Sequence, residues 1–301
     1  MKNTKIIGIT SYRPSIHFLC IPAAMLLLMS AMSCNGSNYI DAPEIIETSE
    51  TRNMGRAPNS ADTADFIPGT ETIYAKNVAF KMVHVQGGSF MMGAGPEQGG
   101  DEWNNEKPMH KVTLSHFAIA ETEVTQALWT AIMGDNPSYR RGDNLPVEQI
   151  SYQDGLDFID KLNKATGRNF RMPTEAEWEY AARGGQKSKG YKFSGSNNLD
   201  EVANFADNSH GNTQPVGSKK SNEIGLYDMS GNVWEWCSDW FSEYTNEDLV
   251  NPIGPITGTE RCLRGGSWYS ISRYCRVTNR HYNDPDVRYD YYRGMRLAYS
   301  L

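Results

Sequence analysis

Cysteine and histidine, two residue types that often bind metals or act as catalysts, are few in this chain and scattered along it. Three cysteines, Cys237, Cys262 and Cys275, lie in the second half of the sequence. In an exported protein they allow one disulfide and leave one free thiol, and their spacing does not decide which pair forms it. The sequence has no CxxC, HExxH or glycine-rich phosphate loop, and the closest histidines, His110 and His116, flank a strand-like KVTLS. These two histidines are therefore expected on the surface or in the core instead of at a metal.

One short stretch, GLYDMSGNVWEW (225–236), places oxygen ligands close together. Asp228 and Glu235 supply carboxylates, and a turn at Gly231 lets backbone carbonyls face the same point. Such a set of hard oxygen ligands suits Ca²⁺. The simpler interpretation is a tight turn with solvated acids, followed by a core formed by Trp234 and Trp236.

Tyrosines gather near the C-terminus. Residues 269–292 hold six of the sixteen tyrosines, where the average usage of the chain would place about one. The stretch DPDVRYDYYRG (284–294) shows no apolar period of a helix or of a strand. Rigid tyrosines interleaved with adaptable polar side chains are typical of a paratope. The alternative is an ordinary polar wall of tyrosine-rich loops. The candidate binding residues are Tyr269, Tyr274, His281, Tyr282, Asn283, Asp284, Tyr289, Asp290, Tyr291 and Tyr292.

Composition narrows the class of partner. The chain has 301 residues, 39% of them hydrophobic, with 27 glycines and 14 prolines, which indicates one sizeable core with many loops. Its net charge is −7, and residues 1–33 contain three cations and no acid, so the remainder has a charge of −10. An acidic protein is a poor partner for nucleic acid.

The N-terminus is typical of an export signal. Lys2, Lys5 and Arg13 precede a largely apolar run from Phe18 to Met32, which is short for a membrane span. Residues 1–33 are therefore predicted to be a signal peptide. The site before Cys34 resembles that of bacterial lipoproteins, which implies a lipid anchor on Cys34 in the outer membrane or at the cell surface. Ordinary secretion to the periplasm is the alternative. The polar residues 34–76 are predicted to be a flexible tether.

The body, residues 77–301, mixes short strands with three short helices. FKMVHVQGGSFMMG (80–93) predicts a hairpin about residues 86–88, and KVTLSHFAIA (111–120) predicts one further strand. Apolar stripes and capping residues predict helices that begin at Thr125, Ser151 and Thr174. Beyond residue 190 no long helix is expected, so the fold class is α+β with few helices and long irregular loops. Loops of that extent need a metal, a disulfide or dense tryptophan packing to fix them.

A series of phrases in the body resembles the sulfatase-modifying-factor family, the formylglycine-generating enzyme domain. They are GGSFMMG, ETEVTQALW, RMPTEAEWEYAARGG, NEIGLYDMSGNVWEWCSDW, LRGGSWYS and RGMRLA. The resemblance implies the formylglycine-generating-enzyme variant of the C-type lectin fold. It also implies a calcium site at Asp228, Gly231, Val233 and Glu235. A second family site begins at a position matching Asn204 and Phe205, where the following loop is shorter in this chain.

The same resemblance implies an oxidase. Enzymes of this family convert a substrate cysteine to formylglycine with O₂ and a copper(I) ion held by two cysteines spaced CxxxxC. The matching residues are Ser270 and Cys275. A hydroxyl does not replace a thiolate as a ligand of copper(I), so half of the copper site is missing. Cys275 could equally form a disulfide with Cys237.

The C-terminal tyrosines resemble a subclass of this fold, the variable proteins of diversity-generating retroelements, which are often exported lipoproteins. The leading hypothesis is therefore a lipid-anchored protein that binds an extracellular protein or glycan through residues 269–292. The alternatives are a formylglycine-generating oxidase and a structural lipoprotein of a secretion or gliding assembly.

Overall fold

The computed structural model describes residues 66–288 and 290–301, and the prediction of an α+β fold with short strands and few helices is confirmed. The longest helix, α2, has 15 residues, and the longest strand, β2, has eight. The helices are α1 Gln126–Met133, α2 Tyr152–Thr166, α3 Glu175–Ala182 and α4 Leu199–Val202. The strands are β1 Thr70–Ala75, β2 Val78–Val85, β3 Gly88–Met92, β4 His110–Leu114, β5 Phe117–Ala120, β6 Trp234–Trp240, β7 Leu249–Val250, β8 Arg261–Arg264, β9 Arg280–Asn283, β10 Arg293–Met295 and β11 Ala298–Ser300.

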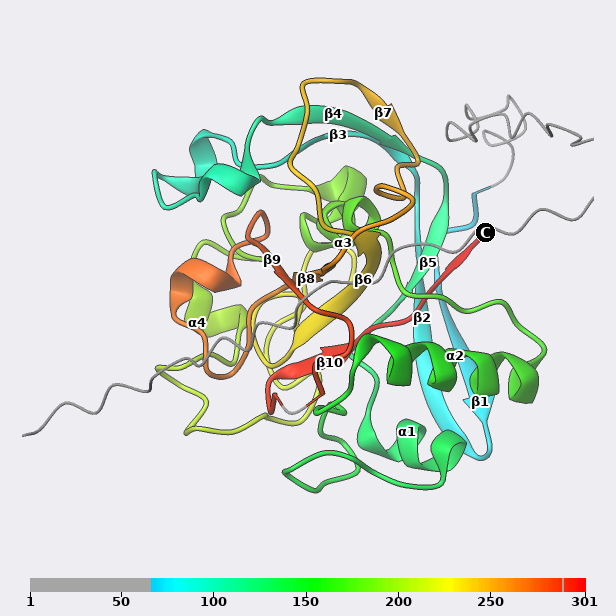
Figure 1. Cartoon of the computed structure of the whole chain (residues 1–301). Helices are drawn as coiled ribbons and strands as arrows, with labels where there is room; N and C mark the ends of the chain where they lie inside the picture. Colours follow the sequence, from blue (N-terminus) through cyan, green and yellow to red (C-terminus); the bar gives the residue numbers. More distant parts are fainter. Residues whose placement is uncertain (1–65, 289) are drawn as a thin grey trace, which may run out of the picture. The chain divides into compact units, whose positions relative to one another are not determined.

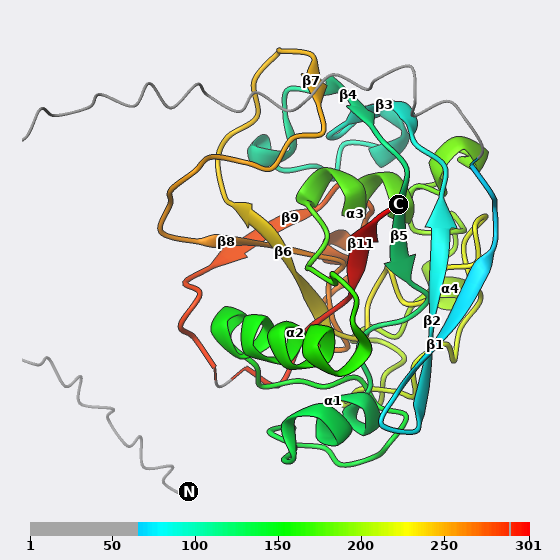
Figure 2. The ribbon, with the colours of Figure 1, turned by 90° about the vertical axis from the view of Figure 1, so that its right-hand side faces the viewer.

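The strands form three small sheets. Their orders are β1-β2-β5-β11, β10-β6-β8-β9 and β3-β4-β7. The first sheet is antiparallel and ends on the C-terminal strand β11, and helices α1 and α2 lie beside its β1–β2 end (Figures 1 and 2). Strand β9 of the second sheet lies within the C-terminal segment that the sequence marks for binding, and β8 and β10 of the same sheet flank that segment.

The predicted hairpin about residues 86–88 is wrong, and so is the single strand over residues 111–120. Strand β2 pairs with β5, whereas β3 pairs with β4 in another sheet. Both chain segments pass from one sheet to the next at the same place, where the N–H of Gly87 donates to Nδ1 of His116 at 2.9 Å. A side chain on Gly87 would lie 2.3 Å from the carbonyl oxygen of Leu114, so the crossing requires glycine.

The folded unit begins before residue 77, which corrects the predicted boundary of the tether. Residues 70–75 form strand β1, which pairs with β2 along its whole length. The predicted signal peptide and Cys34 lie outside the described residues. Within the described part, no helix is long and apolar enough to cross a membrane.

The three predicted helices are confirmed with their caps. The hydroxyls of Thr125, Ser151 and Thr174 accept backbone N–H groups in the first turns of α1, α2 and α3. Helices α1 and α2 end at Gly134 and Gly167, both in the left-handed conformation. Each of these capping signals acts within a few residues of chain, so it can be recognised in the sequence.

Within the described residues, buried ion pairs hold the irregular C-terminal half in place, and no disulfide does so. Its three cysteines are free thiols, so the disulfide that the sequence allowed, with Cys237 and Cys275 as one possible pair, is not formed. The two residues lie in different hydrophobic clusters. In place of a bridge, four buried arginines bind buried glutamates; the pairs are Arg264–Glu179, Arg276–Glu106, Arg280–Glu175 and Arg296–Glu235.

We expect the Arg276→Met variant to lose about 3–5 kcal/mol of unfolding free energy, because Glu106 would stay buried without its cation. Arg276 Nη1 lies 2.7 Å from Glu106 Oε2, and both side chains are fully buried. Lys164→Met is the control, since its pair with Asp160 is exposed and should contribute about 0.5 kcal/mol or less. Urea unfolding measures both values. Equal losses in the two variants would contradict a dominant role for the buried pairs.

Candidate functional site

The tyrosine-rich segment, residues 269–292, runs across the second sheet. It leaves β8 through Gly265 and Gly266, both with positive φ, and returns as β9 beside β8. A side chain on Gly266 would lie 2.8 Å from Sγ of Cys275, so the turn needs glycine. After β9 the chain forms a loop and ends in β10, which lies parallel to β6. The segment is thus anchored by strands before, within and after it.

The structure divides the predicted binding residues into an exposed and a packed set. Tyr269, Tyr291 and Tyr282 have exposed fractions of 71%, 46% and 37%, and Asp284 is also exposed. The half-buried residues are Tyr274, His281, Asn283, Asp290 and Tyr292. Tyr289 lies outside the described residues. The candidate binding residues therefore do not all lie at the surface, because Tyr274 and Tyr292 pack against the core.

The packed residues are held by aromatic neighbours. The ring of Tyr274 lies between those of Trp103 and Trp234, with centroids 6.3 Å away in both cases. His281 packs against Trp234 at 5.0 Å, and burial lowers the pKa of its imidazole. Trp103 stands more than 160 positions away in the sequence, so no local pattern could show this packing.

The exposed tyrosines continue onto residues that the sequence analysis did not single out. Trp268 packs against Tyr269 at 5.4 Å, and its indole N–H donates to the carbonyl oxygen of Tyr291 at 2.8 Å. Tyr291 in turn contacts Tyr139, 63% exposed, at 4.9 Å. Tyr282 is separate and packs on Phe241 at 4.1 Å. We call the first group, Tyr139, Trp268, Tyr269 and Tyr291, the aromatic surface.

The residues at the expected copper site do not fit copper(I). Cys275 is fully buried in an apolar cluster, and burial raises the pKa of its thiol to about 12. Ser270 is engaged in hydrogen bonds, since its Oγ accepts the backbone N–H of Ser267 at 3.0 Å. A protonated thiol and a hydroxyl do not form the thiolate pair that this soft cation requires.

The acidic residues of the expected calcium site have different environments. Both oxygens of Glu235 accept hydrogen bonds from Arg296, at 2.7 and 2.9 Å, and one also accepts from Trp178. Protein donors thus already engage both oxygens of this carboxylate. Asp228, at φ +58°, accepts the N–H of Gly217 through Oδ2, while its buried Oδ1 has no partner.

A further carboxylate, missed in the sequence, lies beside Asp228. Glu123 is buried, and neither of its oxygens has a hydrogen-bond partner. Burial, followed by the charge of Asp228, raises the pKa of Glu123 well above its usual value. No local pattern could show this contact, because 105 positions separate the two residues.

The other expected calcium residues form a tight backbone junction. The Asn204 carbonyl accepts the N–H of Asn232 at 2.7 Å, and a side chain on Gly231 would lie 2.3 Å from that carbonyl oxygen. Phe205 and Val233 are buried. Among the described residues, no group of three or more His, Cys, Asp or Glu side chains is arranged to hold a metal.

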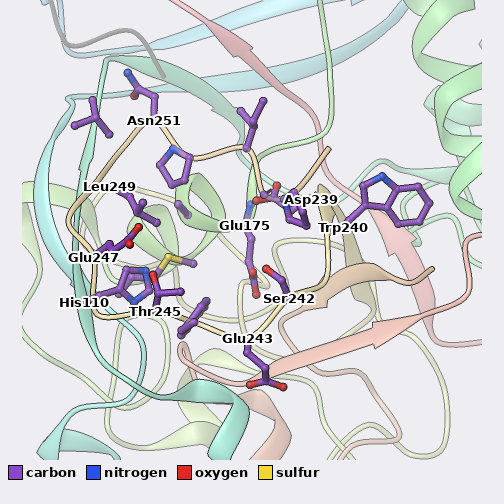
Figure 3. A pocket seen from close by; sticks show the side chains of 18 of the residues that line it. His110, Glu175, Asp239, Trp240, Ser242, Glu243, Thr245, Glu247, Leu249 and Asn251 are labelled. Carbon is purple, nitrogen blue, oxygen red and sulfur yellow. Dashed lines mark hydrogen bonds between the residues drawn. The ribbon is translucent and has the colours of Figure 1, made fainter. Parts of the chain in front are cut away.

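A separate cavity of about 640 Å³ opens at the end of β6, under the loop that contains β7 (Figure 3). Asp239 and Glu175 lie on its inner side, and Glu243, Glu247 and Asp248 are exposed around it. Asp239 accepts the N–H of Glu175 at 2.9 Å. Burial, and then the charge of Glu175, raises the pKa of Asp239 to about 7. The lining suits a cationic ligand better than an anionic one.

Comparisons with known proteins agree on one family. The model of the sulfatase-modifying factor enzyme 1-like domain matches residues 71–301. The formylglycine-generating enzyme of Streptomyces coelicolor is 32% identical over 277 residues, covering 68% of this chain and 84% of the enzyme. The chaperone protein LppX of Paenibacillus barcinonensis is 39% identical over 209 residues, covering 53% of this chain and 71% of that protein.

Two solved structures have a similar fold. Treponema denticola variable protein 1 superposes with a TM-score of 0.72 at 32% identity, covering 78% of this chain and 100% of that protein. PvdO of Pseudomonas aeruginosa gives a TM-score of 0.69 at 27% identity, covering 79% of this chain and 100% of that protein.

The raised pKa of Asp239 predicts a pH-dependent stability. The folded state holds this proton more tightly than the unfolded state, so its contribution is present below about pH 4 and is lost as pH rises through 7. The Asp239→Asn variant should have the same unfolding free energy as the wild type at pH 4. At pH 8 its unfolding free energy should be higher by a few kcal/mol, because the pKa of Asp239 is raised by about three units in the folded state. Urea unfolding at both pH values measures this difference. Asp248→Asn, on the exposed rim, should leave the pH profile unchanged, and identical profiles for all three proteins would refute the assignment.

Proposed function

Because this chain belongs to the sulfatase-modifying factor enzyme 1-like family, which has the formylglycine-generating-enzyme variant of the C-type lectin fold, we propose that it uses this scaffold to bind a ligand. The proposed binding face is the aromatic surface, and Tyr282 and Asp284 are exposed on the same segment without belonging to that group. The ligand is an extracellular protein or glycan.

The exposed aromatic residues carry the proposal. Tyr269, Tyr291 and Tyr139 leave about half or more of their area in water, although neighbouring tyrosines of the same segment are packed. Grouped, exposed aromatics are typical of interaction sites, where they become the anchors of the interface. The anchoring strands hold these side chains in place before a ligand arrives, which lowers the entropic cost of binding.

The likeness to Treponema denticola variable protein 1 supports a binding role, since that structure aligns over its whole length. In the variable proteins of diversity-generating retroelements, binding residues near the C-terminus differ between copies. The same arrangement here would let residues 269–292 change while the strands and buried arginines around them stay constant. The oxidase alternative has less support, because Cys275 and Ser270 do not provide two thiolates.

We further propose that the protein is exported and anchored through a lipid on Cys34. The cationic start and the apolar run that ends just before Cys34 support this proposal. Mass spectrometry of the protein from a membrane fraction tests it, and a mature chain that still begins at Met1 would exclude it.

Calcium is proposed to bind at Asp228, with Glu123 in the place expected for Glu235. Asp228 has one free buried oxygen and Glu123 has two, and the carbonyls of Gly231 and Val233 are the backbone ligands expected from the family. The charge of Asp228 raises the pKa of Glu123, and that of the nearby Arg296 lowers it without restoring the usual value. A divalent ion between the two carboxylates would remove their repulsion.

We expect any ligand found by a glycan array or by a screen of extracellular peptides to depend on the aromatic surface. Tyr269→Ala and Tyr291→Ala should each weaken binding by about 2 kcal/mol, roughly thirtyfold, as for central aromatic anchors. Their unfolding free energies should change by only about 0.5 kcal/mol. Tyr74→Ala is the matched control, since Tyr74 is 70% exposed on β1. Unchanged affinity in both surface variants would show that the ligand binds elsewhere.

Chelation should lower the melting temperature of the wild type, because a ligand at 100 times its dissociation constant adds about 2.7 kcal/mol to stability. The Glu123→Gln variant should be the more stable protein with chelator and the less stable one with calcium. With chelator the variant should be more stable than the wild type, since it no longer has to keep a buried carboxyl group protonated at neutral pH, and with calcium it should gain little. Glu243→Gln, an exposed control, should behave as the wild type. A wild type that melts at the same temperature with calcium and with chelator would rule out the site.

A further inference from the structure

A small cavity of about 70 Å³ lies within the aromatic surface. Tyr139, Trp268 and Tyr291 form aromatic walls, and Glu148 also lines it. Arg140 and residues 211–213 complete the lining. Neither the expected copper residues nor the expected calcium residues contribute to it.

Two buried polar groups of this cavity have no hydrogen-bond partner. Glu148 is only 1% exposed; its Oε1 accepts the N–H of Arg140 at 3.1 Å, whereas its buried Oε2 has no partner. Thr213 is 5% exposed, and its hydroxyl also has no partner. A buried acceptor left without a donor costs about 1–3 kcal/mol, more for a charged group. Such groups in a ligand-binding protein point to a donor that arrives with the ligand.

The walls suit a cation. The rings of Tyr139 and Tyr291 are 4.9 Å apart, and the bond from the Trp268 indole to the Tyr291 backbone holds the third ring beside them. Aromatic faces attract ammonium groups, most strongly where water is excluded. The guanidinium of Arg140 already lies 5.5 Å from the ring of Tyr139.

The volume limits the size of the group that enters. A benzene ring occupies an engineered cavity of about 150 Å³, about twice the volume found here. A sugar ring is therefore too large, whereas an ammonium group with one or two methylenes fits.

We infer that this cavity binds the protonated amine of a partner, of the kind that a lysine side chain presents, between Glu148 and the three aromatic rings. The inference rests on the proposed function, since Trp268 and Tyr291 belong to the aromatic surface. It narrows the ligand to a protein or another amine-bearing molecule. The hydroxyl of Thr213 supplies a second acceptor for the ammonium group.

The amine should bind more tightly as pH rises. Burial raises the pKa of Glu148 to about 7, and a bound cation favours its ionised form. The other charged groups near Glu148 are Arg140, which lines the cavity, and Arg141, whose charge opposes the shift. An alkylammonium ion stays protonated up to a pKa of about 10, so only Glu148 changes charge between pH 6 and 8. Its ionised fraction, and with it the affinity, should rise about tenfold over that range.

The test is a titration of the full chain, with ¹⁵N-labelled tryptophan, by n-butylammonium chloride. The indole resonance of Trp268, identified by its loss in Trp268→Phe, should shift and saturate. Butan-1-ol, the neutral molecule of the same size, should not shift it. Glu148→Gln should weaken amine binding at least about tenfold and abolish its pH dependence. This variant retains Oε1 as an acceptor for Arg140, and Thr213→Val tests the same cavity independently.

The remaining variants separate the possible outcomes. Glu243→Gln, at the other acidic cavity, should have no effect, and a loss there would move the amine to that cavity. Binding of acetate in place of the amine, lost in Arg140→Ala, would show an anion site and overturn the inference. A natural ligand that depends on Tyr269 while butylammonium fails to bind would leave the proposed function intact and refute the amine cavity alone.

Discussion

The pairing of buried arginines with buried glutamates is the constraint on which the C-terminal half of the protein depends. Arg264, Arg276, Arg280 and Arg296 come from a short stretch of sequence, and three of their partners, Glu106, Glu175 and Glu179, precede residue 180. A buried ion pair adds little net stability against apolar residues of the same size, but the loss of one partner is costly. The pairs therefore specify one arrangement of loops that have little regular structure to guide them.

In this arrangement, the residues that hold the backbone in place differ from those whose side chains form the aromatic surface. Tyr269 and Trp268 lie between Arg264 and Arg276, and Tyr291 lies between Arg280 and Arg296. Each segment that carries residues of the aromatic surface is thus short, and a buried arginine holds it at each end. Substitutions on the aromatic surface need not disturb the core, because the contacts that fix the backbone belong to other residues. A scaffold of this kind can accept substitutions on the aromatic surface because the buried arginines keep the backbone in place.

The parts of the fold that the sequence predicts are those that local interactions determine. Helix α2 follows from Ser151, its apolar stripe and Gly167, all within one segment. The strand partners do not follow, because β2 and β3 are neighbours in sequence but belong to different sheets. The same limit applies to the site. The excess of tyrosine predicts exposed aromatics near the C-terminus, but the half-burial of Tyr274 depends on Trp103, far away in the chain.

The residues that the sequence analysis missed share one physical property. Glu123 and Glu148 look like ordinary surface acids in their local sequences, yet both are buried with unpartnered oxygens. Their environment contrasts with that of Glu106, whose two oxygens both bind Arg276. A fold that supplies an arginine to one buried glutamate and none to another treats the two charges differently, and the unpaired carboxylate must either hold a proton or meet a cation. Burial raises the pKa of both Glu123 and Glu148, and the cation sites that we propose at these two residues depend on their unpartnered oxygens as much as the proposed binding face depends on its exposed tyrosines.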